Sequence, residues 1–180
     1  MRVIGGILKG HVLHPPRNLP VRPTTDRSKE ALFNILSNQL DFSGLNGLEL
    51  FAGTGNISLE FLSRGIDSMT AYDIHHGCVR YMKQVAEKLK LDNFYIHKGN
   101  AVKLLQAKKN IGEFDVVFAD PPFNLPDIVN LPELILEGGL LKEKGIFILE
   151  HPKLVQFPDS SYLQDIRKYG ESVFRFYVKT

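Results

Sequence analysis

The amino-acid sequence predicts an α/β fold, in which helices cover a seven-stranded, mostly parallel sheet that closes with an antiparallel hairpin. From residue 47 onward, short β-rich runs alternate with helix-length amphipathic segments, a pattern typical of a parallel sheet wrapped by helices. The last two β-type runs flank Tyr169-Gly170-Glu171 with no helix between them, which favours an antiparallel pair. A chain of 180 residues, 43% of them apolar, is long enough to bury one substantial core.

Five parallel strands and four helices are expected in alternation. The strands are placed near 47–51, 68–72, 94–97, 114–119 and 146–150. The helices between them are placed near 57–64, 76–90, 101–108 and 127–137. Each helical segment has apolar residues at three- and four-residue spacing, as Val79, Met82 and Val85 illustrate. The two strands of the hairpin are expected at 162–168 and 172–178.

The first 46 residues follow a different pattern and are interpreted as an extension of the main domain, 47–180. Gly5-Gly6 and Lys9-Gly10 interrupt short apolar runs there, and a proline-rich stretch covers residues 15–23. Residues 26–40 have one apolar face, formed by Leu32, Leu36 and Leu40 among others, which predicts an amphipathic helix. We therefore expect a small N-terminal β-ribbon and a helix docked on the main sheet.

Charge and composition exclude several classes of protein. The first 30 residues contain six basic and two acidic side chains, a net charge of +4, whereas the whole chain has +2. This asymmetry indicates a patch that contacts a polyanion, although short basic stretches are often only solvated. A single cysteine, Cys78, leaves no internal disulfide, and the six histidines lack ligand spacing, so we expect no metal. Without a membrane-length apolar run or a signal-peptide core, we expect a cytoplasmic protein and no membrane partner.

A glycine turn follows the first expected strand, in the run Leu48-Glu49-Leu50-Phe51-Ala52-Gly53-Thr54-Gly55-Asn56-Ile57-Ser58. Such a turn lets the backbone approach a ligand, and the following helix directs N–H groups at it. Ser58 occupies the place of the third glycine in a dinucleotide motif, and Glu49 is a poor neighbour for a pyrophosphate. Both features disfavour a dehydrogenase. Glu49 instead suits the ammonium group of S-adenosylmethionine, although a glycine turn without any nucleotide is the alternative.

Polar residues also follow the next two expected strands. Asp73 ends the second strand, about 20 residues beyond the glycine turn, where an acidic side chain would bind ribose hydroxyls. Asn100 and Ala101 follow the third strand, where an amide or the backbone could meet the edge of adenine. Taken singly, Asp73 and Asn100 are more often helix caps. Taken together, these positions lie at the carboxyl ends of successive parallel strands, where open α/β sheets bind ligands.

The tetrapeptide Asp120-Pro121-Pro122-Phe123 directly follows the expected strand 114–119. Its two prolines fix φ and lack N–H groups, so we expect the backbone carbonyls there to remain available to a substrate. Asp120 adds an anionic acceptor and Phe123 a flat face for stacking. This combination would satisfy an exocyclic amino group on a planar base, although Pro-Pro after a strand is also an ordinary strand stop.

These motifs, together with three blocks in the N-terminal part, resemble a known family. The blocks are residues 2–10, with Arg2-Val3-Ile4-Gly5-Gly6 and Lys9-Gly10, residues 22–27 and residues 30–36. They are similar to the RsmD-like 16S rRNA guanine-N2 methyltransferases, within the class I S-adenosylmethionine-dependent methyltransferases. The glycine turn and the Asp-Pro-Pro-Phe motif are shared more widely, by DNA adenine methyltransferases and, with Asn first, by protein glutamine methyltransferases.

The resemblance implies a Rossmann-like class I methyltransferase fold and assigns roles to particular residues. It implies that the extension 1–46 contacts RNA and that 47–180 binds S-adenosylmethionine. The implied cofactor contacts are Glu49, Phe51, Ala52, Gly53, Thr54, Gly55, Asn56, Asp73, Ile74, Asn100 and Ala101. The target base would lie against Asp120, Pro121, Pro122 and Phe123. The implied phosphate contacts are Lys9, Arg22, Arg27 and Arg64. His75 stands where such proteins often have a second acidic residue, which leaves the adenosine contacts open.

The expected activity is methylation of the N2 amino group of a guanine in 16S rRNA, within a small-subunit ribosomal particle. A DNA adenine-N6 or protein glutamine-N5 methyltransferase would share the same arrangement of motifs. It would usually need a separate target-recognition region, for which this chain leaves little room. A non-catalytic RNA-binding module would explain the basic N-terminal segment but not the prolines after Asp120.

Overall fold

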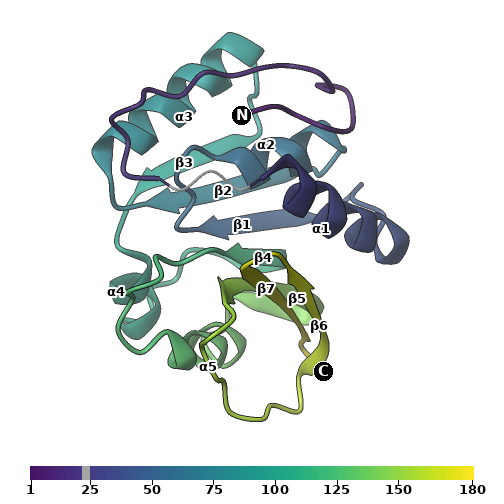
Figure 1. Cartoon of the computed structure of the whole chain (residues 1–180), viewed down its shortest axis with the longest axis vertical. Helices are drawn as coiled ribbons and strands as arrows, with labels where there is room; N and C mark the ends of the chain where they lie inside the picture. The colour runs from purple at the N-terminus through teal and green to yellow at the C-terminus, as the bar shows by residue number, and fades with distance from the viewer. Residues whose placement is uncertain (22–24) are drawn as a thin grey trace.

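The structure, a computed structural model, describes residues 1–21 and 25–180. Its strands form one seven-stranded sheet in the order β3-β2-β1-β4-β5-β7-β6, with helices against both faces (Figure 1). The strands are β1 (Asn46–Leu50), β2 (Ser68–Asp73), β3 (Phe94–Lys98), β4 (Phe114–Ala119), β5 (Leu141–Pro152), β6 (Leu163–Tyr169) and β7 (Ser172–Val178). The helices are α1 (Asp26–Gln39), α2 (Asn56–Ser63), α3 (His76–Leu89), α4 (Ala101–Gln106), η1 (Ile128–Asn130) and α5 (Leu131–Leu136).

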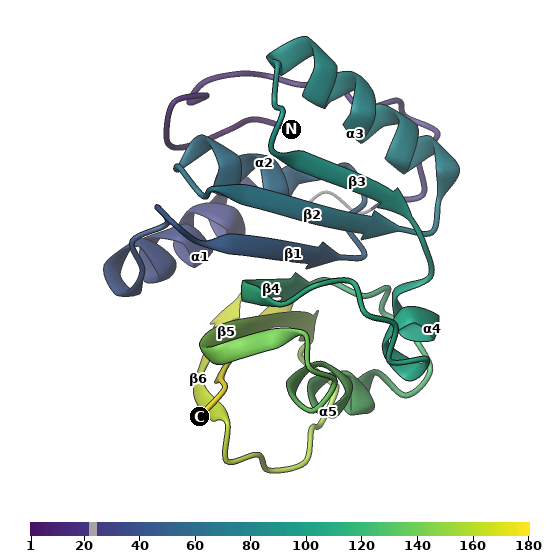
Figure 2. The same cartoon turned by 180° about the vertical axis from the view of Figure 1, so that it is seen from behind.

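Parallel pairing brings the carboxyl ends of the first five strands to one edge of the sheet. β1 pairs in parallel with β2 and β4, β2 with β3, and β4 with β5. β7 is inserted antiparallel between β5 and β6. Figure 2 shows the parallel strands from behind, in the order β3, β2, β1, β4 and β5. The predicted fold class is therefore confirmed. The strand order reverses between β1 and β4, and open sheets bind ligands at such a switch point.

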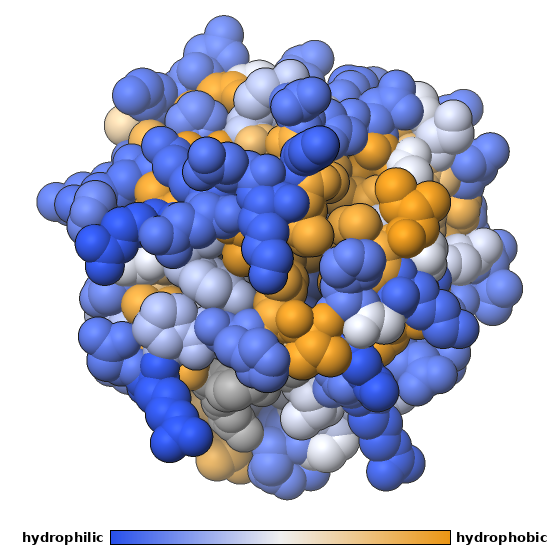
Figure 3. Space-filling model, turned by 90° about the horizontal axis from the view of Figure 1, so that it is seen from above, coloured by the Kyte–Doolittle hydropathy of each residue, from blue (hydrophilic) through white to orange (hydrophobic). Residues whose placement is uncertain are grey.

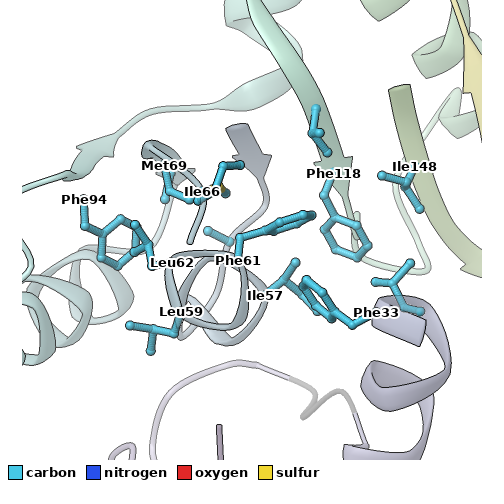
Figure 4. Close-up of a cluster of buried hydrophobic side chains, with 14 of the residues drawn as sticks. Phe33, Ile57, Leu59, Phe61, Leu62, Ile66, Met69, Phe94, Phe118 and Ile148 are labelled. Carbon is cyan, nitrogen blue, oxygen red and sulfur yellow. The ribbon is translucent and has the colours of Figure 1, made fainter. Parts of the chain in front are cut away.

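Two hydrophobic clusters lie on opposite faces of the sheet. Val116 and Phe118 of β4 belong to the cluster under α1, α2 and α3, whereas Val117 and Ala119 belong to the cluster under α4 and α5. In the first cluster, Phe33 of α1 lies edge-on to Phe61, with ring centroids 4.7 Å apart; Figure 4 shows both rings beside Phe118. Burial of each such side chain contributes roughly 1.5–3 kcal/mol. The predicted helix 26–40 is therefore docked on the main sheet.

The predicted N-terminal ribbon is present but very short. Arg2 and Val12 form a single antiparallel bridge, flanked by backbone hydrogen bonds from Val3 N to the His11 carbonyl (3.0 Å) and from Leu13 N to the Met1 carbonyl (2.9 Å). The turn between the two arms has a left-handed Gly6, with φ of 71°. A Cβ at that glycine would collide with the backbone of Ser63 in α2, so the turn is packed directly on the main domain.

A buried ionic network joins the N-terminal segment to α2. The fully buried Lys29 of α1 lies 3.4 Å from the Glu60 carboxylate of α2. Its Nζ also donates to the Arg2 carbonyl (2.5 Å) and to Asn56 Oδ1 (2.8 Å). Burial lowers the pKa of Lys29, and the nearby Glu60 opposes that shift. Residues 1–46 therefore share a core with the main domain, and their assignment as an RNA-contacting extension stays a prediction.

Three predicted boundaries were wrong. The helix expected at 127–137 begins at Ile128, because Asp127 is left-handed. It is divided into η1 and α5 where Pro132 provides no N–H at the start of α5. The helix expected at 101–108 ends at Gln106, and Lys108 is left-handed. β5 begins at Leu141 rather than 146, because its backbone pairing with β4 continues past an irregularity in the register. The added residues have no alternating apolar pattern that would have predicted a strand.

Two further properties concern the described residues alone. None of their helices combines the length and apolar character needed to cross a bilayer. No group of three or more His, Cys, Asp or Glu side chains in the described ranges could hold a metal ion.

Candidate active site

A pocket of about 920 Å³ lies at the carboxyl edge of the sheet. The glycine turn after β1, Asp73 of β2, the tetrapeptide 120–123 after β4 and Glu150 of β5 all line it. A second cavity of about 530 Å³ adjoins it through Phe51, Asp73 and other shared residues, and extends to Asn100. On the face of the molecule drawn in Figure 3, hydrophobic residues gather around a hollow and hydrophilic residues surround them. The strand ends that the sequence singled out therefore meet in one place.

Most of the predicted cofactor contacts border these cavities. Those in the larger one are Glu49, Phe51, Ala52, Gly53, Thr54, Asn56, Asp73 and Ile74. Asn100 and Ala101 border the smaller one, together with Phe51, Asp73 and Ile74. Gly55 lines neither: it precedes α2, and a Cβ there would lie 3.0 Å from the Met82 side chain. That glycine is needed for its backbone and its packing against α3.

The glycine turn is a left-handed loop held by Asp73. Phe51, Gly53 and Gly55 have φ values of 59°, 55° and 72°. The N–H of Gly53 donates to Asp73 Oδ2 at 2.8 Å, and His75 N donates to the other carboxylate oxygen at 2.7 Å. Asp73 therefore fixes the turn after β1 relative to the start of α3, and still borders both cavities.

Glu49 is a buried carboxyl group beneath the start of α2. Its Oε2 accepts hydrogen bonds from Ser58 N (2.9 Å) and from the Ser58 hydroxyl. Burial raises its pKa to about 7, although the Ser58 hydrogen bonds act in the opposite direction. Ser58, which stands in the place of the third glycine, thus holds the Glu49 carboxyl group. The comparison with the dinucleotide motif did not reveal this role. A carboxyl group poised near neutrality would ionise beside a bound cation.

Asn100 has the capping role that was weighed as an alternative to adenine binding. Its Oδ1 accepts a hydrogen bond from Lys103 N at 3.1 Å and caps α4. Because its side chain also borders the second cavity, the cap holds it at the wall of that cavity.

The tetrapeptide after β4 places an acid and an exposed ring on the far side of the larger pocket. Pro121 is buried, whereas the Phe123 side chain is 45% exposed. The expectation that the carbonyls here stay available was wrong for Pro122, whose carbonyl accepts from Leu125 N at 2.9 Å in a turn. The carbonyl of Pro121 has no such backbone partner within the described residues. The prediction that Asp120 and the Pro121 carbonyl are acceptors for a substrate therefore stays a prediction.

Several residues around the pocket were not predicted. Glu150 is only 5% exposed and lines the same pocket as Asp120. It directly follows the apolar run 146–149, as Asp120 follows its own strand, and this layout could have identified it. The turn between β6 and β7 and parts of the N-terminal segment, including Pro15 and Pro20, also line the pocket. No local pattern indicated that these segments return to the site.

The predicted phosphate contacts have different environments. Arg27, in the first turn of α1, is exposed and lines the larger pocket. Arg64 is held inside the fold: its Nε lies 2.9 Å from Glu60 Oε1 and its guanidinium stacks 4.9 Å from the Phe33 ring centroid. Lys9 is exposed in the N-terminal turn and lies outside the pocket lining. Arg22 falls outside the described residues.

Comparisons with known proteins match nearly the whole chain. The family model described as "Conserved hypothetical protein 95" matches residues 1–178. A Bacillus subtilis (strain 168) protein, provisionally named rRNA methyltransferase YlbH, is 34% identical over 163 residues, covering 89% of this chain and 87% of that protein. Ribosomal RNA small subunit methyltransferase D of Escherichia coli (strain K12) is 30% identical over 185 residues, covering 99% and 90%. A hypothetical protein of Thermus thermophilus, TTHA0928, has a similar structure, with a TM-score of 0.84 at 28% identity, over 100% of this chain and 99% of that chain.

Proposed function

We propose that this protein methylates the N2 amino group of a guanine in 16S rRNA. The premise is that the chain belongs to the family described as conserved hypothetical protein 95 and is an RsmD-like methyltransferase. The observation that carries the proposal is one pocket lined both by the glycine turn with Glu49 and by the tetrapeptide 120–123. A site for a methyl donor and a site for a planar amine therefore adjoin each other.

S-adenosylmethionine is the cofactor that suits the glycine-turn side of the pocket. Its amino and sulfonium groups are cationic, and the buried Glu49, with a pKa of about 7, becomes a carboxylate when a cation is near. Asp73 lies where ribose hydroxyls would donate to it. The left-handed Gly53 lets the backbone approach the ligand. When bound, the cofactor supplies a methyl group that passes from sulfur to the amino nitrogen, which loses one proton.

Asp120 and Phe123 orient the base. The guanine amino nitrogen is a weak nucleophile because its lone pair is delocalised into the ring. The Asp120 carboxylate and the Pro121 carbonyl can each accept one amino N–H, which turns the lone pair away from them and toward the cofactor side. Phe123, an aromatic residue in the pocket lining, would supply the ring for stacking. Most of the rate advantage then comes from positioning, and Asp120 need not be a strong base.

The RNA must present an unpaired base to this pocket. A base paired in a helix cannot reach Asp120, so the target nucleotide is single-stranded or flipped from its stack. Arg27, exposed at the pocket, is the best-placed described residue for a neighbouring phosphate. The E. coli relative is named for ribosomal RNA of the small subunit, which favours 16S rRNA in a small-subunit particle and hence a cytoplasmic site of action.

The decisive experiment identifies the methylated nucleoside. Small ribosomal subunits and naked 16S rRNA, both from a strain without the gene for this protein, are incubated with the purified protein and S-adenosylmethionine carrying a tritiated methyl group. We expect label in N2-methylguanosine after digestion to nucleosides. Subunits from the parent strain, already methylated at the site, serve as the control. Label in N6-methyladenosine, or in ribosomal protein glutamine, would refute the proposal in favour of the corresponding alternative.

A further inference from the structure

We propose that Glu150 accepts a hydrogen bond from N1–H of the target guanine, and so selects guanine over other bases that carry an amino group. This inference rests on the proposed function and deepens it, because it names the residue that distinguishes guanine. Asp120 holds the amino group that is methylated, and Glu150 recognises the ring atom beside that group.

The strand register places Asp120 and Glu150 side by side. Phe118 of β4 pairs with Ile148 of β5, and Ala119 pairs with Leu149. Asp120 and Glu150 are the next residue on each of these parallel neighbours, which lie about 4.8 Å apart. Side chains alternate between the two faces of a sheet, so both acids lie on the face where Phe118 and Ile148 belong to one cluster.

Glu150 is built into the wall of the substrate side of the pocket. It is 5% exposed but lines the same pocket as Asp120, Pro121 and Phe123. Its backbone is fixed on the other side by pairing with Phe174 of β7. The paired strand thus fixes the carboxyl group of Glu150 in the wall of the pocket that Asp120 also lines.

The pairing edge of guanine matches two adjacent carboxylates. Guanine has its N1–H donor directly beside the N2 amino group, so its N–H groups form a continuous row. In adenine, in cytosine and in the glutamine side chain, the atom beside the amino group is an acceptor. That acceptor would face the carboxylate of Glu150, lone pair against lone pair, when the amino group binds at Asp120. Repulsion of this kind is an effective means of rejecting the wrong substrate.

The test changes one hydrogen-bonding group on each partner. N1 of the base becomes an acceptor, and the carboxylate of Glu150 becomes an amide. The target guanosine, once mapped, is replaced by 2-aminopurine nucleoside through splint ligation of 16S rRNA, followed by reconstitution into small subunits. This base keeps the 2-amino group but has an acceptor at N1. The wild type should prefer guanine by about 100-fold or more in kcat/KM. Glu150→Gln, whose amide can donate to a bare N1, should reduce that preference by about tenfold or more.

Matched variants separate recognition from folding. Glu143→Gln makes the same change at an exposed residue of β5 that pairs with Lys179 at 3.6 Å, and should leave the preference unchanged. Glu150→Asp keeps the charge but retracts it, so it should lower kcat/KM while retaining the preference for guanine. It also provides the test if Glu150→Gln proves unstable in thermal unfolding.

The outcomes distinguish this inference from the proposed function. If Glu150→Gln folds and methylates guanine with wild-type kcat/KM and unchanged preference over 2-aminopurine, Glu150 has no such role and the proposed function stands. The same conclusion follows if Glu150→Asp folds and methylates guanine with wild-type kcat/KM. If the wild type forms no N2-methylguanosine, the proposed function fails and this inference fails with it.

Discussion

The two sides of the pocket hold their acidic residues in different ways. On the side proposed to bind the cofactor, Glu49 and Asp73 accept hydrogen bonds from backbone N–H groups of Ser58, Gly53 and His75, at 2.7–2.9 Å. On the side proposed to bind the base, Asp120 follows the end of β4 and Glu150 lies within β5. The β6–β7 turn and residues of the N-terminal segment line the same pocket. One side is built from consecutive turns of the chain, whereas the other is assembled from distant segments.

The two kinds of wall differ in how readily they can vary. Backbone hydrogen bonds to Glu49 and Asp73 hold the glycine turn in one conformation before a ligand binds. Such pre-organisation favours affinity for a ligand that does not change, such as a cofactor. A wall assembled from distant segments can change with each of those segments, and thereby adapt to different substrates. The following predictions test that division of labour, from the largest expected effect to the smallest.

Asp120→Ala should abolish most of the turnover while leaving cofactor binding intact. Removing an acceptor that orients the reacting group should lower kcat by about 10²- to 10³-fold, whereas the Kd for S-adenosylmethionine, measured by titration calorimetry, should change little. Asp159→Ala, at an exposed loop position, is the control. A parallel loss of cofactor affinity would show that the two sides of the pocket are not independent.

Cofactor affinity should depend on pH through Glu49. The free carboxyl group has a pKa of about 7, and a bound cation favours its ionised form, so binding below that pH must release a proton. Affinity should therefore rise with pH up to about 7 and then level off. Glu49→Gln should remove this dependence and weaken binding by about 10- to 100-fold at neutral pH. Equal pH profiles for the variant and the wild type would contradict the assigned contact.

Arg27 and Arg64 should separate RNA binding from stability. Arg27→Ala should reduce the salt dependence of RNA binding, with the slope of log K against log salt falling by about 1, and leave the unfolding temperature unchanged. Arg64→Ala should lower the free energy of unfolding, because it removes a contact to the buried Glu60 and the stacking on Phe33. Filter binding and urea denaturation measure the two effects. An RNA-binding defect in a stable Arg64→Ala protein would restore the original expectation for that residue.

Local patterns were sufficient for much of the fold and for part of each side of the site. A few neighbouring residues were enough to predict the alternation of strands and helices, the glycine turn and the tetrapeptide 120–123. The structure brings the glycine turn and the tetrapeptide to one edge of the sheet. The boundaries that failed, in β5 and around Asp127, depend on an irregular register and on a left-handed residue. Neither feature leaves an apolar periodicity in the sequence.

The sequence by itself determined the order of the elements, the position of the glycine turn and the presence of an acid followed by two prolines after β4. Only the tertiary structure decided which polar side chains meet. Ser58 binds Glu49, Arg64 is held by Glu60, and Glu150 lines the same pocket as Asp120. The physical reason is that periodicity and turn chemistry act between near neighbours in the chain, whereas these contacts depend on strand order and register, which bring together residues far apart in the sequence.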